Sequence, residues 1–332
     1  MRGGLLQLRR RASSVRSDQL TVYYASDVHG SEECWRKFLS AAKFYKAQAL
    51  IMGGDLTGKA IVPITREVTG KHTAKFLGEQ RVAKNDEEVQ QLLRAIRFNG
   101  FYPWIADASE IAAVADDPDA QARLFDDLMT GEVRRWIGLA DERFADSSTS
   151  VYVMAGNDDP WSIDDALEGA PGVTACDDRI VVVEGHEMIS SSYANPTPWN
   201  SPRELDENEL YSRLNALAQQ LEAPARAIFN LHVPPYDTGI DTANQLNPDL
   251  TRVMKHGEPV DVPVGSHAVR QLIEEYQPLL ALHGHIHESR GDARIGRTLA
   301  LNSGSEYNTG RLHGVRVVLE PDSIVSHQFV VG

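Results

Sequence analysis

The chain has 332 residues, a formal net charge of −14 and 42% hydrophobic residues, a composition typical of a soluble globular protein with one large domain and an insertion, or with two domains. The acidic balance argues against stable nucleic-acid binding, which needs clustered Lys and Arg, and no run approaches the roughly 18 apolar residues of a membrane span. Cys34 and Cys176 stand in no metal-ligand spacing and favour a reducing compartment, so we expect a cytoplasmic protein.

Residues 1–19 are predicted to be a disordered basic arm ahead of a folded domain over residues 20–332. The arginines of the arm are Arg2, Arg9, Arg10, Arg11 and Arg16. The pair Leu5 and Leu6 is too short for the apolar centre of a secretion signal. Two alternatives stay open, a start codon placed too early and a weak transit peptide.

Five short apolar runs are predicted to be buried strands, because they are β-branched or aromatic in part and are closed by Gly or Pro. The runs are residues 20–25, 49–52, 151–155, 227–231 and 278–282. Between the first two runs, Ser31, Glu32 and Glu33 predict the start of a helix, because acids in the first turn complement the helix dipole.

Residues 57–149 separate the second run from the third and are far longer than an ordinary connection, which predicts an inserted cap-like region. Within it we expect a β-hairpin over residues 61–77 and amphipathic helices over 86–99 and 119–145. The aromatic residues of this region would either stack on a nucleobase or pack as core. They are Phe101, Tyr102, Trp104 and Trp136.

After the third run, residues 179–192 predict two strands around Gly185, and a helix is expected over residues 202–221. Residues 239–263 are rich in Asp, Asn, Pro and Gly and predict a long surface loop, followed by a helix that Ser266 caps. Strands over residues 299–302, 314–319 and 324–331 are expected to close the chain.

A polar cluster follows each of the five apolar runs directly. The clusters are Asp27-Val28-His29, Gly54-Asp55, Gly156-Asn157-Asp158-Asp159, His232, and His283-Gly284-His285-Ile286-His287. Ligands bind beyond the carboxyl ends of the strands in open α/β sheets, so these residues are predicted to converge. The two-residue step puts Asp27 with His29, and His285 with His287, on one side of an extended chain.

The residue types in these clusters fit metal binding. Carboxylate, imidazole and amide groups without a thiolate form a ligand set that suits Mn, Fe or Zn. A carboxylate can bridge two cations, and paired ions about 3.5–4 Å apart are the usual clamp for attack on phosphorus. We expect Asp55 to be this bridge. A single Asp or His after a strand is more often a turn or capping residue than a metal ligand. Turn and capping roles do not explain why five such clusters occur in order along the chain.

The ordered clusters resemble the calcineurin-like metallophosphoesterases, whose pattern is D-x-H, G-D, G-N-H-D/E, a His after a strand, and G-H-x-H. Four of these five blocks match here. Residues 231–236 and 265–289 further resemble the Icc-related subgroup of predicted phosphoesterases. The resemblance implies an α/β fold, a two-sheet αββα sandwich flanked by helices, with a helical insertion after the second strand.

The resemblance also implies two divalent metal ions, of which we favour Mn. The implied ligands of one ion are Asp27, His29, Asp55 and His287, and those of the other are Asp55, Asn157, His232 and His285. Water or hydroxide on the metals would attack the phosphate. The serines near the motifs, Ser26, Ser303 and Ser305, are then turn and capping residues.

The chain departs from the family pattern at Asp158, where most members have a histidine that donates a proton or contacts the phosphate. An acid beside two cations is expected to stay ionised, which favours phosphodiesters over the dianions of phosphomonoesters. Ligation of a metal is the other option for Asp158. Asp159 is expected to cap a helix that starts at Pro160.

These observations predict a metal-dependent phosphoesterase that favours phosphodiesters and acts on a small phosphorylated substrate, such as a nucleotide. The catalytic residues would be Asp158, Asn157 and His232. Two alternatives stay open: a non-enzymatic metal-binding interaction scaffold, and, ranked lowest, a single-zinc hydrolase that uses Asp27, His285 and His287. The oligomeric state is not predicted.

Three residues near the clusters receive separate expectations. His283 alternates in phase with His285 and His287 but lies outside the family pattern, so we expect a packed or supporting histidine. Arg290 is the nearest candidate for a phosphate clamp, and a surface ion pair is its alternative. Tyr236 is a candidate contact for the non-phosphate part of the substrate.

Overall fold

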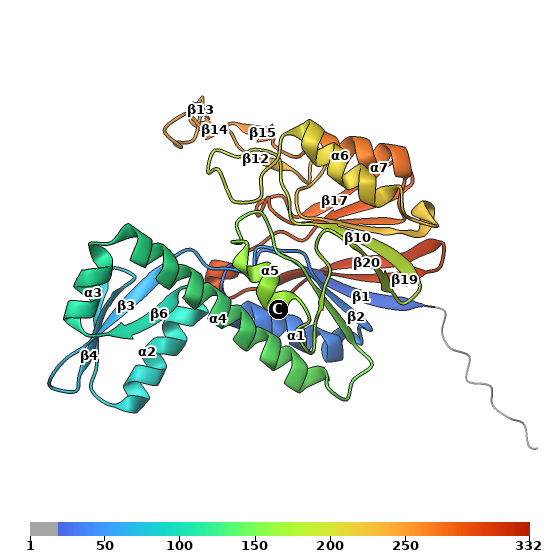
Figure 1. Ribbon diagram of the computed structural model, residues 1–332. Helices are drawn as coiled ribbons and strands as arrows, with labels where there is room; N and C mark the ends of the chain where they lie inside the picture. The colour runs from blue at the N-terminus through green and yellow to red at the C-terminus, as the bar shows by residue number, and fades with distance from the viewer. Residues whose placement is uncertain (1–18) are drawn as a thin grey trace, which may run out of the picture.

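The computed structural model describes residues 19–332, so the predicted basic arm lies outside the described residues apart from Gln19. Two six-stranded sheets form the body of the molecule (Figure 1). The first sheet has the order β20-β19-β1-β2-β7-β8. Its strands are β1 (Leu20–Ala25), β2 (Ala49–Met52), β7 (Ser150–Val153), β8 (Thr174–Ala175), β19 (His313–Glu320) and β20 (Ser323–Val331).

The second sheet has the order β17-β18-β16-β11-β10-β9. Its strands are β9 (Ile180–Val183), β10 (His186–Ser191), β11 (Ile228–Leu231), β16 (Leu280–His283), β17 (Gly291–Ile295) and β18 (Thr298–Asn302). In both sheets the central strands are parallel, because β1, β2 and β7 run together, as do β10, β11, β16 and β18. The loops that follow parallel strands therefore meet at one edge of each sheet.

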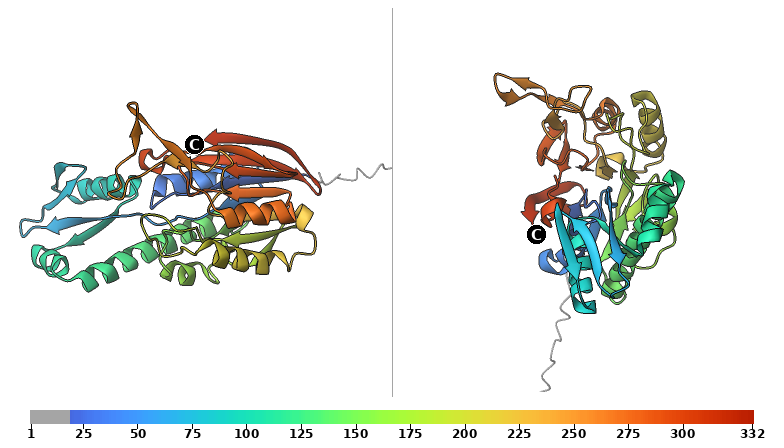
Figure 2. Two further views of the ribbon diagram at one scale, coloured as in Figure 1. Left: turned by 90° about the horizontal axis from the view of Figure 1, so that it is seen from above. Right: turned by 90° about the vertical axis from the view of Figure 1, so that its left-hand side faces the viewer.

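Helices cover the outer face of each sheet, as the views in Figures 1 and 2 show. Helices α1 (Glu32–Tyr45), α4 (Pro118–Phe144) and α5 (Ser162–Leu167) share a core with the first sheet. Helices α6 (Glu207–Ala218) and α7 (His267–Tyr276) share one with the second sheet, and the two sheets enclose a third core between them. The predicted αββα sandwich is confirmed. Two short 3-10 helices, η1 (Pro224–Arg226) and η2 (Tyr307–Thr309), lie in loops.

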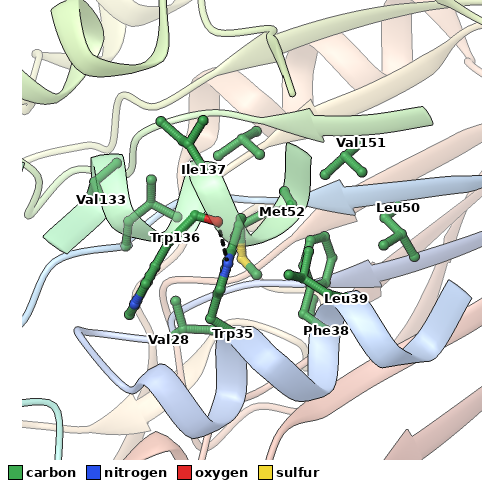
Figure 3. Close-up of a cluster of buried hydrophobic side chains, with 14 of the residues drawn as sticks. Val28, Trp35, Phe38, Leu39, Leu50, Met52, Val133, Trp136, Ile137 and Val151 are labelled. Atoms are coloured by element: carbon green, nitrogen blue, oxygen red, sulfur yellow. Dashed lines mark hydrogen bonds between the residues drawn. The ribbon is translucent and has the colours of Figure 1, made fainter. Parts of the chain in front are cut away.

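Helix α1 packs against α4 through two stacked tryptophans. The ring centroids of Trp35 and Trp136 are 5.3 Å apart, and the Trp35 indole N–H donates to the Trp136 carbonyl at 3.0 Å (Figure 3). Both side chains are almost fully buried. Ser31 caps α1 and Glu32 and Glu33 lie in its first turn, as predicted. Trp136 is therefore a core residue and not a base-stacking surface.

The chain between β2 and β7 holds a four-stranded sheet with the order β5-β4-β3-β6. Its elements are β3 (Ile61–Arg66), β4 (His72–Phe76), β5 (Glu79–Ala83), α2 (Asp86–Phe98), β6 (Tyr102–Ala106) and α3 (Ala108–Ala115). Val62, Ile64, Phe76 and Ile96 give it a small core of its own. The predicted hairpin, α2 and α4 are present, whereas β5 and β6 were not predicted. We call residues 57–117 the insert, and Figure 1 shows them to one side of the sandwich.

Residues 239–263 are more ordered than the predicted surface loop. They form two small antiparallel sheets, β12 with β15 and β13 with β14. The strands are β12 (Thr242–Asn244), β13 (Met254–Lys255), β14 (Glu258–Pro259) and β15 (Asp261–Pro263). Strands of two or three residues are too short to show a hydrophobic period, so the sequence pattern did not predict them. Among residues 19–332, no helix is long and apolar enough to cross a membrane.

Candidate metal centre

The loops that follow β1 and β2 are joined to each other by main-chain hydrogen bonds. The Asp27 N–H donates to the Gly54 carbonyl and the His29 N–H to the Asp55 carbonyl, both at 2.9 Å. Asp27, His29 and Asp55 all have positive φ angles. Non-glycine residues with positive φ are costly and cluster at functional sites, where the surrounding bonds hold them in place.

The structure brings six of the seven predicted ligands into two groups whose ligand atoms lie within 4.8 Å of one another. One group is Asp27, His29, Asp55 and His287, and the other is Asp55, His232 and His285. Asp55 belongs to both groups, which is the geometry expected of a bridging carboxylate. These residues come from loops after four different strands, in both sheets of the sandwich.

The nitrogen and oxygen atoms in the first group lie close together. His287 Nε2 is 3.2 Å from Asp27 Oδ1 and 3.1 Å from His29 Nε2, and His29 Nε2 is 3.6 Å from Asp55 Oδ2. In the second group, His232 Nε2 is 3.4 Å from Asp55 Oδ2. Several electron-pair donors aimed at one point fit a cation between them.

Two buried atoms test whether this site fits metal ions. His232 Nδ1 lies 2.8 Å from the Gly53 carbonyl, which makes it the protonated nitrogen and leaves Nε2 with a free electron pair. His232 Nε2 and Asn157 Oδ1 are both buried without a hydrogen-bond partner among the described residues. A buried polar atom without a partner costs about 1–3 kcal/mol, so both atoms fit ligands of a cation.

Two glycines of the motifs leave room for the carboxylates. A Cβ on Gly284 would lie 2.2 Å from Asp27 Oδ2 and 2.2 Å from Ser26 Oγ. A Cβ on Gly156 would lie 2.2 Å from Asp55 Oδ1. Any larger residue would therefore push the carboxylates out of the site. This explains why a glycine precedes His285 and why one precedes Asn157.

Burial and charge set the protonation of the site. Burial lowers the pKa of His29 and of His285 to about 3, so both imidazoles are neutral, as ligands must be. Burial raises the pKa of Asp55 to about 6, against the influence of His232. Burial would lower the pKa of His232, but the carboxylates of Asp55 and Asp27 raise it to about 10. A cation held by the same carboxylates would offset their charge and favour the neutral His232 ring, as a ligand must be.

Asp158 lies beside the cluster with both carboxylate oxygens engaged elsewhere. Its N–H donates to Asp55 Oδ1 at 3.0 Å, Oδ2 lies 2.5 Å from Lys59 Nζ, and Oδ1 accepts from the Ser201 hydroxyl at 2.5 Å. Burial would raise the pKa of Asp158, but Lys59 and Ser201 lower it to about 2. This arrangement agrees with the expected ionised acid and speaks against metal ligation.

Asp159 does not cap a helix, so that expectation is wrong. Its buried carboxylate accepts from the N–H groups of Leu56 and Thr57, from the Thr57 hydroxyl and from the Gly156 N–H, at 2.6–2.9 Å. Helix α5 begins later, at Ser162, with no side-chain cap. Asp159 instead ties the loop that carries Asp55 to the loop that carries Asn157.

Other predicted residues lie away from the ligand atoms. His283 is fully buried, and its Nδ1 lies 2.7 Å from the Leu231 carbonyl, as expected of a packed histidine. Arg290 is not placed as a clamp, because its guanidinium donates to the Val330 carbonyl and lies over Phe329. Tyr236 stacks on His267 at 3.9 Å.

Sequence reasoning missed three residues around the cluster. Tyr307 packs its ring 4.6 Å from that of His29, while Lys59 and Ser201 bind Asp158. None of the three stands in a motif, and each reaches the site from a segment whose path only the fold reveals. The Ser305 hydroxyl donates to the Asp27 carbonyl, which agrees with its predicted turn role.

Comparison with solved structures shows the class of fold. TT1561 of Thermus thermophilus has a TM-score of 0.51 at 13% identity and covers 94% of this chain and 98% of that chain. A second crystal structure has a TM-score of 0.53 at 13% identity, over 95% and 98% of the two chains. Yfce, a phosphoesterase from E. coli, is more distant, with a TM-score of 0.33 at 12% identity over 93% and 98%. The first two of these likenesses, both at 13% identity, show the fold of the chain.

Sequence comparison shows a relative of the chain. The chain is 30% identical over 166 residues to the uncharacterized protein MJ1162 of Methanocaldococcus jannaschii, a match that covers 48% of this chain and 67% of that protein. The chain belongs to one family with MJ1162. No family model matches it, and the Icc-related subgroup stays a prediction.

Proposed function

We propose that the chain is a metal-dependent phosphoesterase that hydrolyses a phosphate ester, with phosphodiesters favoured, at a centre of two divalent cations. The observation that carries the proposal is the sharing of Asp55 by two groups of mostly buried ligands. The proposed ligands of one cation are Asp27, His29, Asp55 and His287. Those of the other are Asp55, Asn157, His232 and His285.

Bound divalent cations supply two effects at such a site: they lower the pKa of water towards neutrality and they offset the charge of the phosphate. The protein residues hold the ligands in place. The Gly53 carbonyl orients the His232 ring, and Asp159 fixes the loop of Asp55. Asn157, His232 and Asp158 are the proposed catalytic residues.

The preference for phosphodiesters rests on Asp158. An ionised carboxylate in place of a histidine is a poor proton donor and repels a phosphomonoester dianion more than the single charge of a diester. Its ion pair with Lys59 offsets part of this repulsion.

A comparison of two generic substrates tests this preference. The parent is expected to hydrolyse bis-p-nitrophenyl phosphate faster than p-nitrophenyl phosphate, and Asp158→His to shift the ratio of kcat/KM towards the monoester. A parent with a strong preference for the monoester would refute it.

The activity itself is tested by removing the shared ligand. Asp55→Asn keeps the size of the side chain but removes its charge, so we expect metal-dependent hydrolysis to fall by about a hundredfold or more. Asp165→Asn makes the same change at an exposed position of α5 and is the matched control. Parent-like turnover in Asp55→Asn would contradict the proposal.

For the cofactor and the substrate we propose a metal and a class of molecule. Mn²⁺ is favoured over Fe and Zn for the mixed oxygen and nitrogen ligands, and a small phosphorylated substrate such as a nucleotide is favoured in the cytoplasm. The competing function is a non-enzymatic metal-binding scaffold, which the absence of the family histidine at position 158 keeps open. A scaffold would bind Mn²⁺ without hydrolysing any ester.

A further inference from the structure

The insert begins at a neck where two backbone segments touch. The Gly58 N–H donates to the Tyr102 hydroxyl at 2.7 Å, and the Tyr102 N–H donates to the Ala60 carbonyl at 2.9 Å. A Cβ on Gly58 would lie 1.9 Å from the Gly100 carbonyl oxygen, so only glycine fits there. These contacts fix the backbone on both sides of Lys59.

The Lys59 side chain reaches from this neck to the metal centre. Its ammonium lies 2.5 Å from Asp158 Oδ2, and Asp158 is held in turn by Ser201 and by its own N–H bond to Asp55 Oδ1. Lys59 is thus a cation beside the ligands of both proposed ions.

The Lys59 ammonium can donate a hydrogen bond to a phosphate, which the ionised Asp158 cannot do. A histidine at position 158 would offer a phosphate a hydrogen-bond donor, whereas an ionised aspartate offers only acceptors. The donor beside Asp55 is instead the Lys59 ammonium, whose side chain is 56% exposed and so remains accessible to a ligand. Arg290, the other candidate clamp, is bound to β20.

We propose that Lys59 binds the phosphoryl group of the substrate at the metal centre, and that Asp158, in addition to the effect of its charge on the substrate, holds the ammonium there. The proposal deepens the proposed phosphoesterase function and rests on it. Lysine is a common point-charge partner of phosphate oxygens. The insert then has a direct part in the site, because Lys59, close to its start, supplies a phosphate contact.

A structural reading of the same contact makes a different prediction. Ion pairs between exposed side chains contribute little to stability, and an ordinary one would leave phosphate binding unchanged. The affinity of the protein for phosphate, measured without turnover, therefore distinguishes a phosphate-binding role of Lys59 from a purely structural one.

The experiment is calorimetric titration of inorganic phosphate into the Mn²⁺-loaded full chain. We compare the parent, Lys59→Met, Lys59→Arg and Lys75→Met, which removes the same charge from an exposed position on β4 of the insert. Lys59→Met is expected to raise the Kd for phosphate about tenfold or more, because a charge-assisted hydrogen bond is lost. Lys59→Arg and Lys75→Met are expected to stay within about threefold of the parent.

The Mn²⁺ content of each variant is measured alongside, and it is expected to be equal. Phosphate affinity of Lys59→Met within about twofold of the parent, an equal loss in Lys75→Met, or a parent that binds Mn²⁺ but no phosphate would each overturn the role of Lys59. A parent that binds no Mn²⁺ would instead refute the proposed function, so the two failures are distinguishable.

Discussion

At the scale of single residues, buried hydrogen bonds hold the ligand loops in place, and no sequence motif marks the residues that make them. Asp159 is the main example, because its carboxylate accepts four hydrogen bonds that join the Asp55 and Asn157 loops. Its neighbour Asp158 faces the site and binds Lys59. Two adjacent acids thus have separate tasks, one structural and one directed at the ligand.

Replacement of Asp159 tests the structural task. An amide has one acceptor oxygen where the carboxylate has two, so Asp159→Asn leaves buried N–H donors without a partner. We expect the free energy of unfolding to fall by about 1–3 kcal/mol in urea denaturation, and Mn²⁺ affinity to fall by about tenfold or more.

Asp165→Asn is the control for the Asp159 substitution, because Asp165 is exposed on the neighbouring helix α5. It is expected to change stability by less than about 0.5 kcal/mol. If Asp159→Asn has the same free energy of unfolding and the same Mn²⁺ affinity as the parent, Asp159 does not hold the two loops together.

At the scale of elements, the contact between α1 and α4 links the chain before the insert to the chain after it. Trp35 and Trp136 stack at this contact, and the Trp136 indole N–H donates to Glu132 at 3.1 Å. Helix α4 is therefore part of the main core, although it continues directly from the insert (Figure 3).

Trp136→Ala removes this contact and leaves a cavity, so we expect a loss of about 3–5 kcal/mol in the free energy of unfolding. Trp199→Ala deletes the same side chain where it is 64% exposed and is expected to cost less than about 1 kcal/mol. Equal losses in the two variants would show that the α1–α4 contact does not stabilise the fold.

The elements that the sequence revealed are continuous apolar runs and helices with an apolar face. The five buried strands are such runs, and helices α1, α2 and α4 each bury one set of side chains. Strand β5 is mostly exposed and β6 contains Pro103, so neither resembles a buried strand. The ligands were predictable because they follow strands directly. Lys59, Ser201 and Tyr307 were not, since they approach the site from loops whose paths depend on the whole fold.

At the scale of the whole molecule, the two sheets deliver their ligands to one place. Asp27, His29 and Asp55 follow strands of the first sheet, and His232, His285 and His287 follow strands of the second. The site therefore exists only when both sheets are packed together. The insert, which has a separate small core, adds Lys59 at its neck.

Anomalous scattering at the Mn, Fe and Zn absorption edges, from crystals grown without chelator, tests the central claim most directly. We predict two peaks per chain, one enclosed by Asp27, His29, Asp55 and His287, and the other by Asp55, Asn157, His232 and His285. A single peak or none, with the chain folded as described, would contradict a centre of two cations that share Asp55.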